Sequence, residues 1–102
     1  MSVLNTTPPD RLTDLRGRPY FLWDLEMSLE QFKQALRHED AEVRAYLLGK
    51  LMRQAKPDDV FVFASIAEIR DLWPRIHRYL GRSAAFWSWL FQVWEAQDRA
   101  RR

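Results

Sequence analysis

The chain has 102 residues, of which 47% are hydrophobic and 29% charged, and its formal net charge is +2. This length suits one domain with one core, and the balanced charge excludes a disordered polyelectrolyte. No apolar run approaches the ~18 residues of a bilayer span, so we expect no membrane segment. The absence of cysteine excludes disulfides, thiolate metal sites and cysteine nucleophiles, and it favours a cytoplasmic protein.

The N-terminal part of the chain, residues 1–17, is predicted to be an irregular arm. Thr6–Pro9 favours extended backbone, while Gly17 and Pro19 interrupt any helix begun earlier. The following segment, Arg18–Asp24, contains four consecutive large apolar residues. Because it is short and close to a proline, we predict an extended segment laid across the core.

Helices are predicted for the rest of the chain. Ser28–Gln31 has the form of a capping box and begins a helix that runs to about Arg37. Asp40 caps a second helix, which runs to about Ala55 and carries two neighbouring apolar stripes, so it is expected to be central. Gly49 lies inside this helix, where glycine is about 1 kcal/mol less favourable than alanine. Close approach of a neighbouring backbone would explain it, as would chance.

The C-terminal half is also predicted to be helical. Val60–Ala64 fits either a helical turn or a strand, and we favour the helix because no partner strand is predicted. Ser65–Glu68 is a second capping-box pattern. Pro74 either kinks the helix that follows or opens a new one at its first position. Gly81 is a natural helix stop, and Ser83 is expected to cap the last helix.

These elements together predict the fold class and the domain organisation. We expect an all-α protein, a compact bundle of four to five short helices preceded by an extended N-terminal arm. The arm occupies residues 1–17, a single helical domain occupies residues 18–97, and an arginine-rich tail occupies residues 98–102.

The last predicted helix has more large apolar residues than a surface helix needs. Seven of the nine residues in Phe86–Trp94 are large and apolar, and they spread over roughly 200° of the helix surface. A surface helix of a small bundle needs an apolar stripe of only about 100°. Two explanations stay open: the arm and Tyr20–Trp23 cover the surplus, or the surplus is a protein interface, where tryptophan and tyrosine dominate.

Arginines form a second notable pattern. Arg75, Arg78 and Arg82 are spaced by three and four residues, which places them on one helical face. With Arg99, Arg101 and Arg102 they suit phosphates or an acidic partner, although a solvated helix face explains them equally simply.

The sequence offers little support for an active site. His38 and His77 have no second ligand at metal-binding spacing, and the three glycines form no phosphate-binding loop. We therefore assign no catalytic residue, expect no metal or cofactor, and predict that the chain is not an enzyme.

Several segments resemble one family of small bacterial proteins. Arg18–Asp24 has its R-x-Y-F-L-W-D start, and Glu42–Ala55 has its E-x-x-x-x-L-L-G-K/R-L-x-x-x-A block. A D-x-F/W pattern follows within Asp59–Phe61, and Glu68–Ile76 has an E-I-x-x-L-W/F-P-x-I/L segment. The resemblance covers roughly Arg18–Trp94. Such proteins are commonly encoded beside nucleotidyltransferase-like toxins of the AbiEii type and are taken to be their antitoxins.

The resemblance implies a non-enzymatic antitoxin that binds such a toxin and neutralises it by occluding its active-site cleft. From the residues we predict six aromatic partner-binding anchors, some of which must also serve the core: Tyr20, Phe21, Trp23, Trp87, Trp89 and Phe91. The alternative is a small nucleic-acid-binding module that uses the face of Arg75, Arg78 and Arg82. Steep dependence of affinity on salt would distinguish this alternative from a tryptophan interface.

Overall fold

A computed structural model of the chain describes residues 5–100, except for the Asp98 side chain. Its elements, in chain order, are η1 (Pro9–Arg11), η2 (Tyr20–Leu22), α1 (Leu29–Ala35), α2 (Ala41–Gln54), α3 (Pro57–Phe63), α4 (Ile66–Asp71), α5 (Trp73–Ile76), η3 (His77–Tyr79) and α6 (Ser83–Ala100), where η marks a 3-10 turn. Within the described residues there is no β-strand, only an isolated bridge between Thr13 and Pro19. The predicted all-α bundle of short helices is confirmed.

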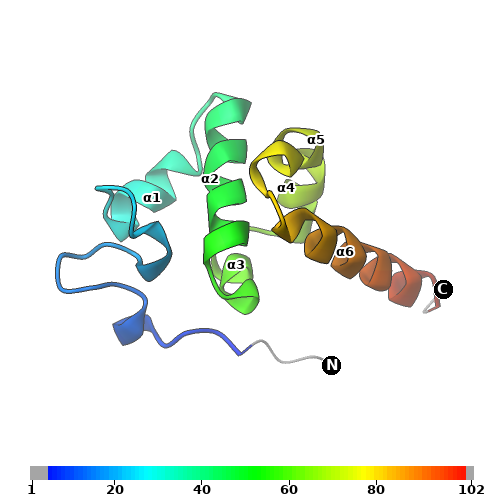
Figure 1. Cartoon of the computed structure of the whole chain (residues 1–102), viewed down its shortest axis with the longest axis horizontal. Helices are drawn as coiled ribbons and strands as arrows, with labels where there is room; N and C mark the ends of the chain where they lie inside the picture. The colour runs from blue at the N-terminus through cyan, green and yellow to red at the C-terminus, as the bar shows by residue number, and fades with distance from the viewer. Residues whose placement is uncertain (1–4, 101–102) are drawn as a thin grey trace.

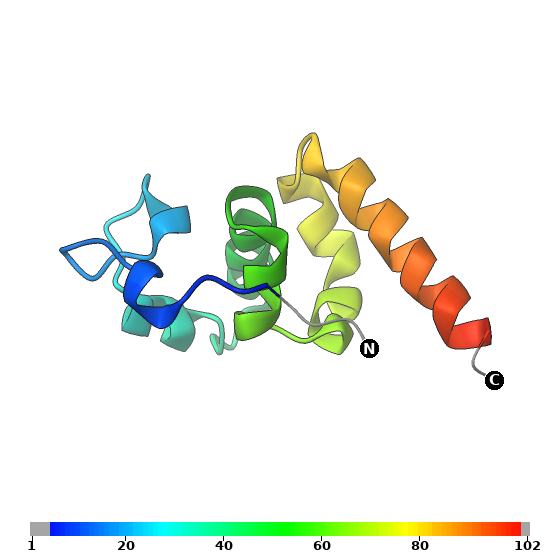
Figure 2. The same ribbon diagram turned by 90° about the horizontal axis from the view of Figure 1, so that it is seen from below.

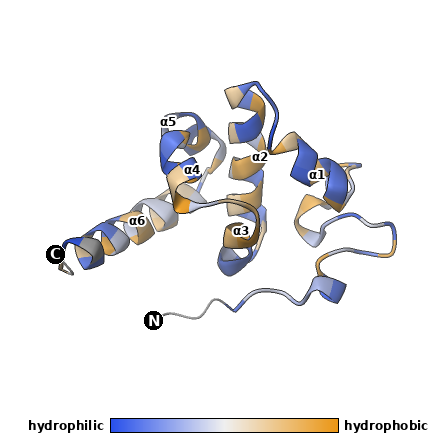
Figure 3. Cartoon of the chain, turned by 180° about the vertical axis from the view of Figure 1, so that it is seen from behind, coloured by the Kyte–Doolittle hydropathy of each residue, from blue (hydrophilic) through white to orange (hydrophobic). Residues whose placement is uncertain are grey.

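Helix α2 lies at the centre of the bundle, with α1 on one side and α4, α5 and α6 on the other (Figures 1 and 2). Most of both predicted apolar stripes is buried, with Leu47 and Leu51 on one and Leu48 and Met52 on the other, whereas Tyr46 of the first stripe is exposed. Figure 3 shows these hydrophobic segments recurring along α2. Gly49 is required here because a Cβ at this position would lie 2.7 Å from the Tyr79 Cβ.

The predicted helix starts are mostly confirmed by hydrogen bonds. The Ser28 hydroxyl accepts from the Gln31 N–H at 3.1 Å, and the Gln31 side chain accepts from the Ser28 N–H at 2.9 Å, which completes the capping box. Asp40 caps α2 through its carboxylate, which accepts from the Glu42 N–H at 2.9 Å. Ser65 caps α4, but its hydroxyl donates to the Glu68 carboxylate, so the second capping box lacks its reciprocal bond to the backbone.

Three expectations about the C-terminal half are decided by the structure. The helical interpretation of Val60–Ala64 is confirmed, although α3 already begins at Pro57. Pro74 opens the new helix α5 as its second residue and does not kink a longer one. The predicted cap at Ser83 is wrong, because Ser83 is the first residue of α6 and its hydroxyl donates to the Leu80 carbonyl at 2.7 Å.

The prediction of an extended Arg18–Asp24 segment is wrong. Tyr20–Leu22 forms the 3-10 turn η2, and Phe21 and Leu22 are both fully buried. A turn allows two consecutive side chains to enter one core, whereas a strand would direct them to opposite faces. The Phe21 ring packs edge-on against Phe32 of α1 and Phe63 of α3, with ring centroids 5.2 and 5.6 Å apart.

The arm is fixed to the bundle by Asp59, a completely buried residue in the first turn of α3. Its carboxylate accepts hydrogen bonds from the Thr7 N–H at 2.7 Å, the Thr7 hydroxyl at 2.5 Å and the Tyr20 hydroxyl at 2.6 Å. Burial raises the pKa of Asp59, but these hydrogen bonds outweigh it and hold the pKa below its usual value. Within its described residues, 5–17, the arm contains only the short turn η1 and is anchored through Thr7.

Candidate functional site

Helix α6 is anchored to the core by one face. Trp87 is 1% exposed, and its indole N–H donates to the Met52 carbonyl of α2 at 3.0 Å. Phe91, one turn further on, is 8% exposed. Phe61 of α3 packs edge-on against Trp87 and Trp94, with ring centroids 6.1 and 5.4 Å apart. These contacts fix which residues of α6 face outward.

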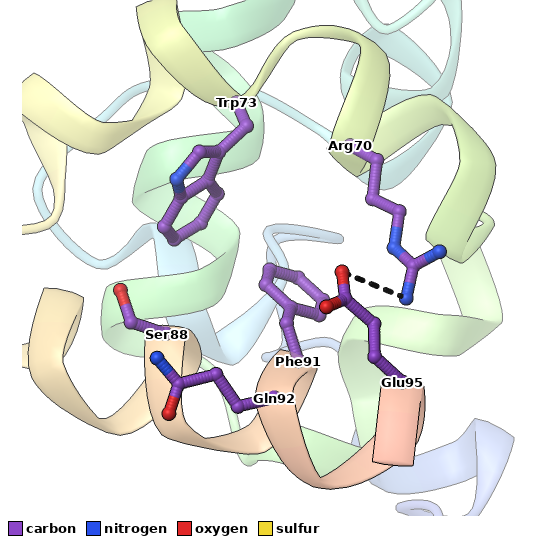
Figure 4. Close-up of a pocket in the computed structure, with 6 residues that line it drawn as sticks. All are labelled: Arg70, Trp73, Ser88, Phe91, Gln92 and Glu95. Atoms are coloured by element: carbon purple, nitrogen blue, oxygen red, sulfur yellow. Dashed lines mark ion pairs between the residues drawn. The ribbon is translucent and has the colours of Figure 1, made fainter. Parts of the chain in front are cut away.

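A groove of about 410 Å³ lies between α4 and α5 on one side and α6 on the other (Figure 4). Its floor is the pair of rings of Trp73 and Phe91, which meet nearly perpendicularly with centroids 5.1 Å apart. An ion pair between Arg70 and Glu95, at 3.7 Å, borders the groove. Ser88 and Gln92 of α6 supply polar groups along the other edge (Figure 4). The groove therefore combines an apolar floor with a polar rim.

An aromatic ridge, which we define as Phe86 and Trp89, lies on the solvent-facing side of α6. Trp89 is 56% exposed and Phe86 is 41% exposed, and their ring centroids are 6.2 Å apart. The arm and η2 do not cover this ridge, because Thr7 is bound to α3 and Phe21 packs against α1 and α3. The explanation that these segments hide the aromatic surplus is therefore wrong for the described residues.

The six predicted anchors do not form one surface. Phe21, Trp87 and Phe91 are buried in the core, so their prediction as surface anchors is corrected by their burial. Tyr20 is half-buried, with its hydroxyl bound to Asp59. Of the six, only Trp23 and Trp89 are exposed. Trp23 directly follows η2, and η2 and α6 lie on opposite sides of α2 (Figures 1 and 2).

The predicted arginine face is also divided. Arg75 and Arg78 both bind one carboxylate oxygen of Glu42 on α2, at 2.9 and 2.8 Å, and the Tyr79 hydroxyl binds the other oxygen at 2.8 Å. The Tyr79 hydrogen bond and the arginines hold the pKa of Glu42 below its usual value. Arg82 follows Gly81, which has a positive φ of 55°, so it does not continue the helical face.

The arginines near the C-terminus are described only as far as Arg99. The residues predicted as the tail, as far as Ala100, belong to α6, and the Arg99 guanidinium donates to the Glu95 carbonyl one turn earlier at 3.4 Å. Arg101 and Arg102 lie outside the described residues.

Sequence reasoning missed Arg70, Trp73 and Glu95 as groove residues. They come from three helices and are up to 25 positions apart, so no local spacing signals their proximity. The six lining residues suit recognition of an apolar side chain flanked by polar groups. Within residues 5–100, no group of three or more histidine, aspartate and glutamate side chains is arranged to hold a metal ion.

The fold and these surfaces define the class: a small all-α protein with an apolar groove and an exposed aromatic ridge on its last helix. Among the described residues no helix has the length and apolarity needed to cross a membrane. Comparison of the chain with protein-family models, curated proteins and solved structures finds no match.

Proposed function

We propose that this chain is a non-enzymatic, antitoxin-like protein that binds a nucleotidyltransferase-type toxin in the bacterial cytoplasm and neutralises it by occluding its active-site cleft. The resemblance over Arg18–Trp94 supplies the class of partner. The observation that carries the proposal is the aromatic ridge, where Trp89 is more than half exposed beside Phe86 on a helix whose opposite face is fixed in the core.

The ridge has the size expected of an interface anchor. A tryptophan or phenylalanine buries roughly 150–250 Å², so covering the exposed part of Trp89 removes about 80–140 Å² from water. At about 25 cal/mol per Å², this burial contributes about 2–3.5 kcal/mol, which is the magnitude of an interface hot spot. Phe86 adds to the same contact because its ring lies against that of Trp89.

The shape of α6 suits occlusion of a cleft. Beyond Trp94, which packs against Phe61, its end extends away from the bundle in both views (Figures 1 and 2). Glu95, Ala96, Gln97, Arg99 and Ala100 are all exposed there. We expect this part of the helix to enter the toxin's cleft, while the neighbouring groove over Trp73 and Phe91 receives an apolar side chain of the toxin.

Affinity capture of the tagged chain from its native cells tests this function. The lysate is treated with nuclease and washed at high salt, and the bound proteins are identified by mass spectrometry. We expect a stoichiometric nucleotidyltransferase-like protein with the wild-type chain and its loss with Trp89→Ala. Trp23→Ala is the matched control, because Trp23 is exposed directly after η2, which lies across α2 from α6 (Figure 1).

The outcomes separate the parts of the proposal. If wild-type chain captures no such protein, the proposed partner is wrong. If Trp23→Ala abolishes capture and Trp89→Ala does not, the partner is right and the ridge is the wrong surface. Inhibition of the captured toxin's nucleotidyl transfer by added wild-type chain, with no turnover by the chain alone, supports neutralisation without catalysis.

A further inference from the structure

A second hollow, distinct from the ridge and the groove, lies between α2 and the turn η3. Its volume is about 210 Å³, and it is lined by Tyr46, Lys50, Arg53, Arg78, Tyr79 and Gly81. We call it the tyrosine pocket. The Tyr46 and Tyr79 rings meet edge to face, with centroids 5.5 Å apart, and Tyr46 is an exposed side chain. The Tyr46 side chain is therefore partly open to solvent at this pocket.

Two glycines make this arrangement possible. Gly49 has no side chain, which allows Tyr79 to pack directly against α2. Gly81 adopts a positive φ of 55° after η3, which turns the chain and places Arg82 next to the pocket's lining. Both glycines thus serve the approach of η3 to α2.

The tyrosine pocket carries an excess of positive charge. Lys50 is only 4% exposed, and its ammonium binds Asp24 and Gln54 while lying 5.8 Å from the Tyr46 ring centroid. The Arg78 guanidinium lies 5.8 Å from the Tyr79 ring centroid. Arg53 and Arg82 are exposed and form no ion pair with any side chain that the structure describes.

The local charge can be counted from these contacts. Three cations line the pocket: Lys50, Arg53 and Arg78. They are balanced by only two contacting carboxylates, Asp24 and Glu42. Asp24 pairs with Lys50 and Glu42 pairs with Arg78, so Arg53 is the lining cation that has no contacting carboxylate among the described side chains. The exposed Arg82 follows the lining residue Gly81 in the chain.

We infer that the tyrosine pocket binds single-stranded nucleic acid, with one base stacked on Tyr46 and neighbouring phosphates on Arg53, Arg78 and Arg82. Exposed aromatic rings beside cations are the features that single strands use, because unpaired bases offer a free face. A duplex hides those faces, and an acidic peptide would leave the ring unused. This surface shares only Arg78 and the neighbouring Arg82 with the arginine face predicted from sequence.

The test is fluorescence anisotropy with labelled 12-residue oligo(U) and oligo(dT), and with a duplex of the same length. The pocket variant is Arg53→Glu/Arg82→Glu. The matched control is Arg16→Glu/Arg37→Glu, which makes the same change in charge at two exposed arginines on the arm and after α1. Tyr46→Ala and Tyr46→Phe test stacking, and circular dichroism checks that every variant keeps its helices.

We expect saturable binding of at least one single strand, tighter than binding of the duplex. Three phosphate contacts give a log–log salt slope of about −2, since each contributes about 0.7. The pocket variant should lower affinity at least tenfold and flatten this slope, while the control variant changes affinity less than threefold. Tyr46→Ala should lower affinity about fivefold or more without changing the slope, and Tyr46→Phe should retain it.

Three results would overturn the inference: no saturable binding of either single strand at low salt, equal binding of the duplex, or equal weakening by the pocket and control variants. A difference between oligo(U) and oligo(dT) identifies which nucleic acid is preferred. The proposed toxin interface is tested separately through Trp89, so failure at the tyrosine pocket leaves that interface standing.

Discussion

Substitution of Gly49 by alanine sets two effects of opposite sign against each other. In an exposed helix interior, alanine is about 1 kcal/mol more favourable than glycine. At Gly49, however, the added Cβ would lie 2.7 Å from the Tyr79 Cβ and 3.7 Å from the Ile76 carbonyl oxygen. The Tyr79 Cβ is attached directly to the backbone of η3, so rotation of the side chain cannot move it away.

The expected magnitude follows from this geometry. Relief of the contact requires η3 to shift away from α2, and overpacking of this kind costs about 1–3 kcal/mol. After the gain in helix propensity, Gly49→Ala should lower the free energy of unfolding by about 0–2 kcal/mol. The sign is thus the reverse of the general expectation for a glycine inside a helix.

Urea unfolding followed by circular dichroism measures this difference. Ala96→Gly, at an exposed position inside α6, is the control that measures helix propensity in this protein and should cost about 1 kcal/mol. For Gly49→Ala we expect a lower urea midpoint and an unchanged dependence of the unfolding free energy on urea concentration. A clear rise in the urea midpoint of Gly49→Ala would mean that Tyr79 does not approach α2 closely and that the tyrosine pocket does not have the shape described above.

Further predictions concern burial and ionisation. Trp87→Ala should lower the free energy of unfolding by about 3–5 kcal/mol, whereas Trp89→Ala should change it by less than about 1 kcal/mol in thermal or urea unfolding. Because the pKa of Asp59 is lowered on folding, its ionised form stabilises the protein at a pH above its ordinary pKa of 3.8, and this stability is lost as the pH falls below that value. Asp59→Asn should therefore make the melting temperature depend less on pH on the acid side. Asp24→Ala should destabilise more than Lys50→Met, because only the former leaves a buried charge unpaired.

Local patterns predicted the helices well because the physics involved is local. The Ser28 capping box and the Asp40 cap satisfy backbone N–H groups within one turn, so three residues suffice to recognise them. The two stripes of α2 likewise require only helical periodicity. Tyr20–Leu22 shows neither helical nor strand periodicity. It forms a turn because the core takes up both Phe21 and Leu22, and this packing cannot be read from the local sequence.

The aromatic surplus of α6 was predictable, but its division between core and surface was not. Helical spacing separates Trp87 from Trp89 by about 200°, so it shows that both cannot face the same neighbour. It does not show which of them is inside. That choice is made by the Met52 carbonyl of α2, which lies 35 positions away and accepts the Trp87 indole N–H. Trp89 is left outside as a consequence.

For the arginines too, helical spacing predicts which side chains share a face, but tertiary contacts determine which of them are open to a phosphate. Spacing groups Arg75 with Arg78, but Glu42, 33 and 36 positions earlier, binds both guanidinium groups and satisfies part of their charge. Arg53 falls outside that spacing and forms no ion pair with any described side chain. A surface chosen by spacing would therefore omit Arg53, whereas the packing of η3 on α2 places Arg53 beside Arg78 and the partly exposed ring of Tyr46. The tertiary contact creates the more capable site, because a single-stranded ligand requires a stacking surface together with charge.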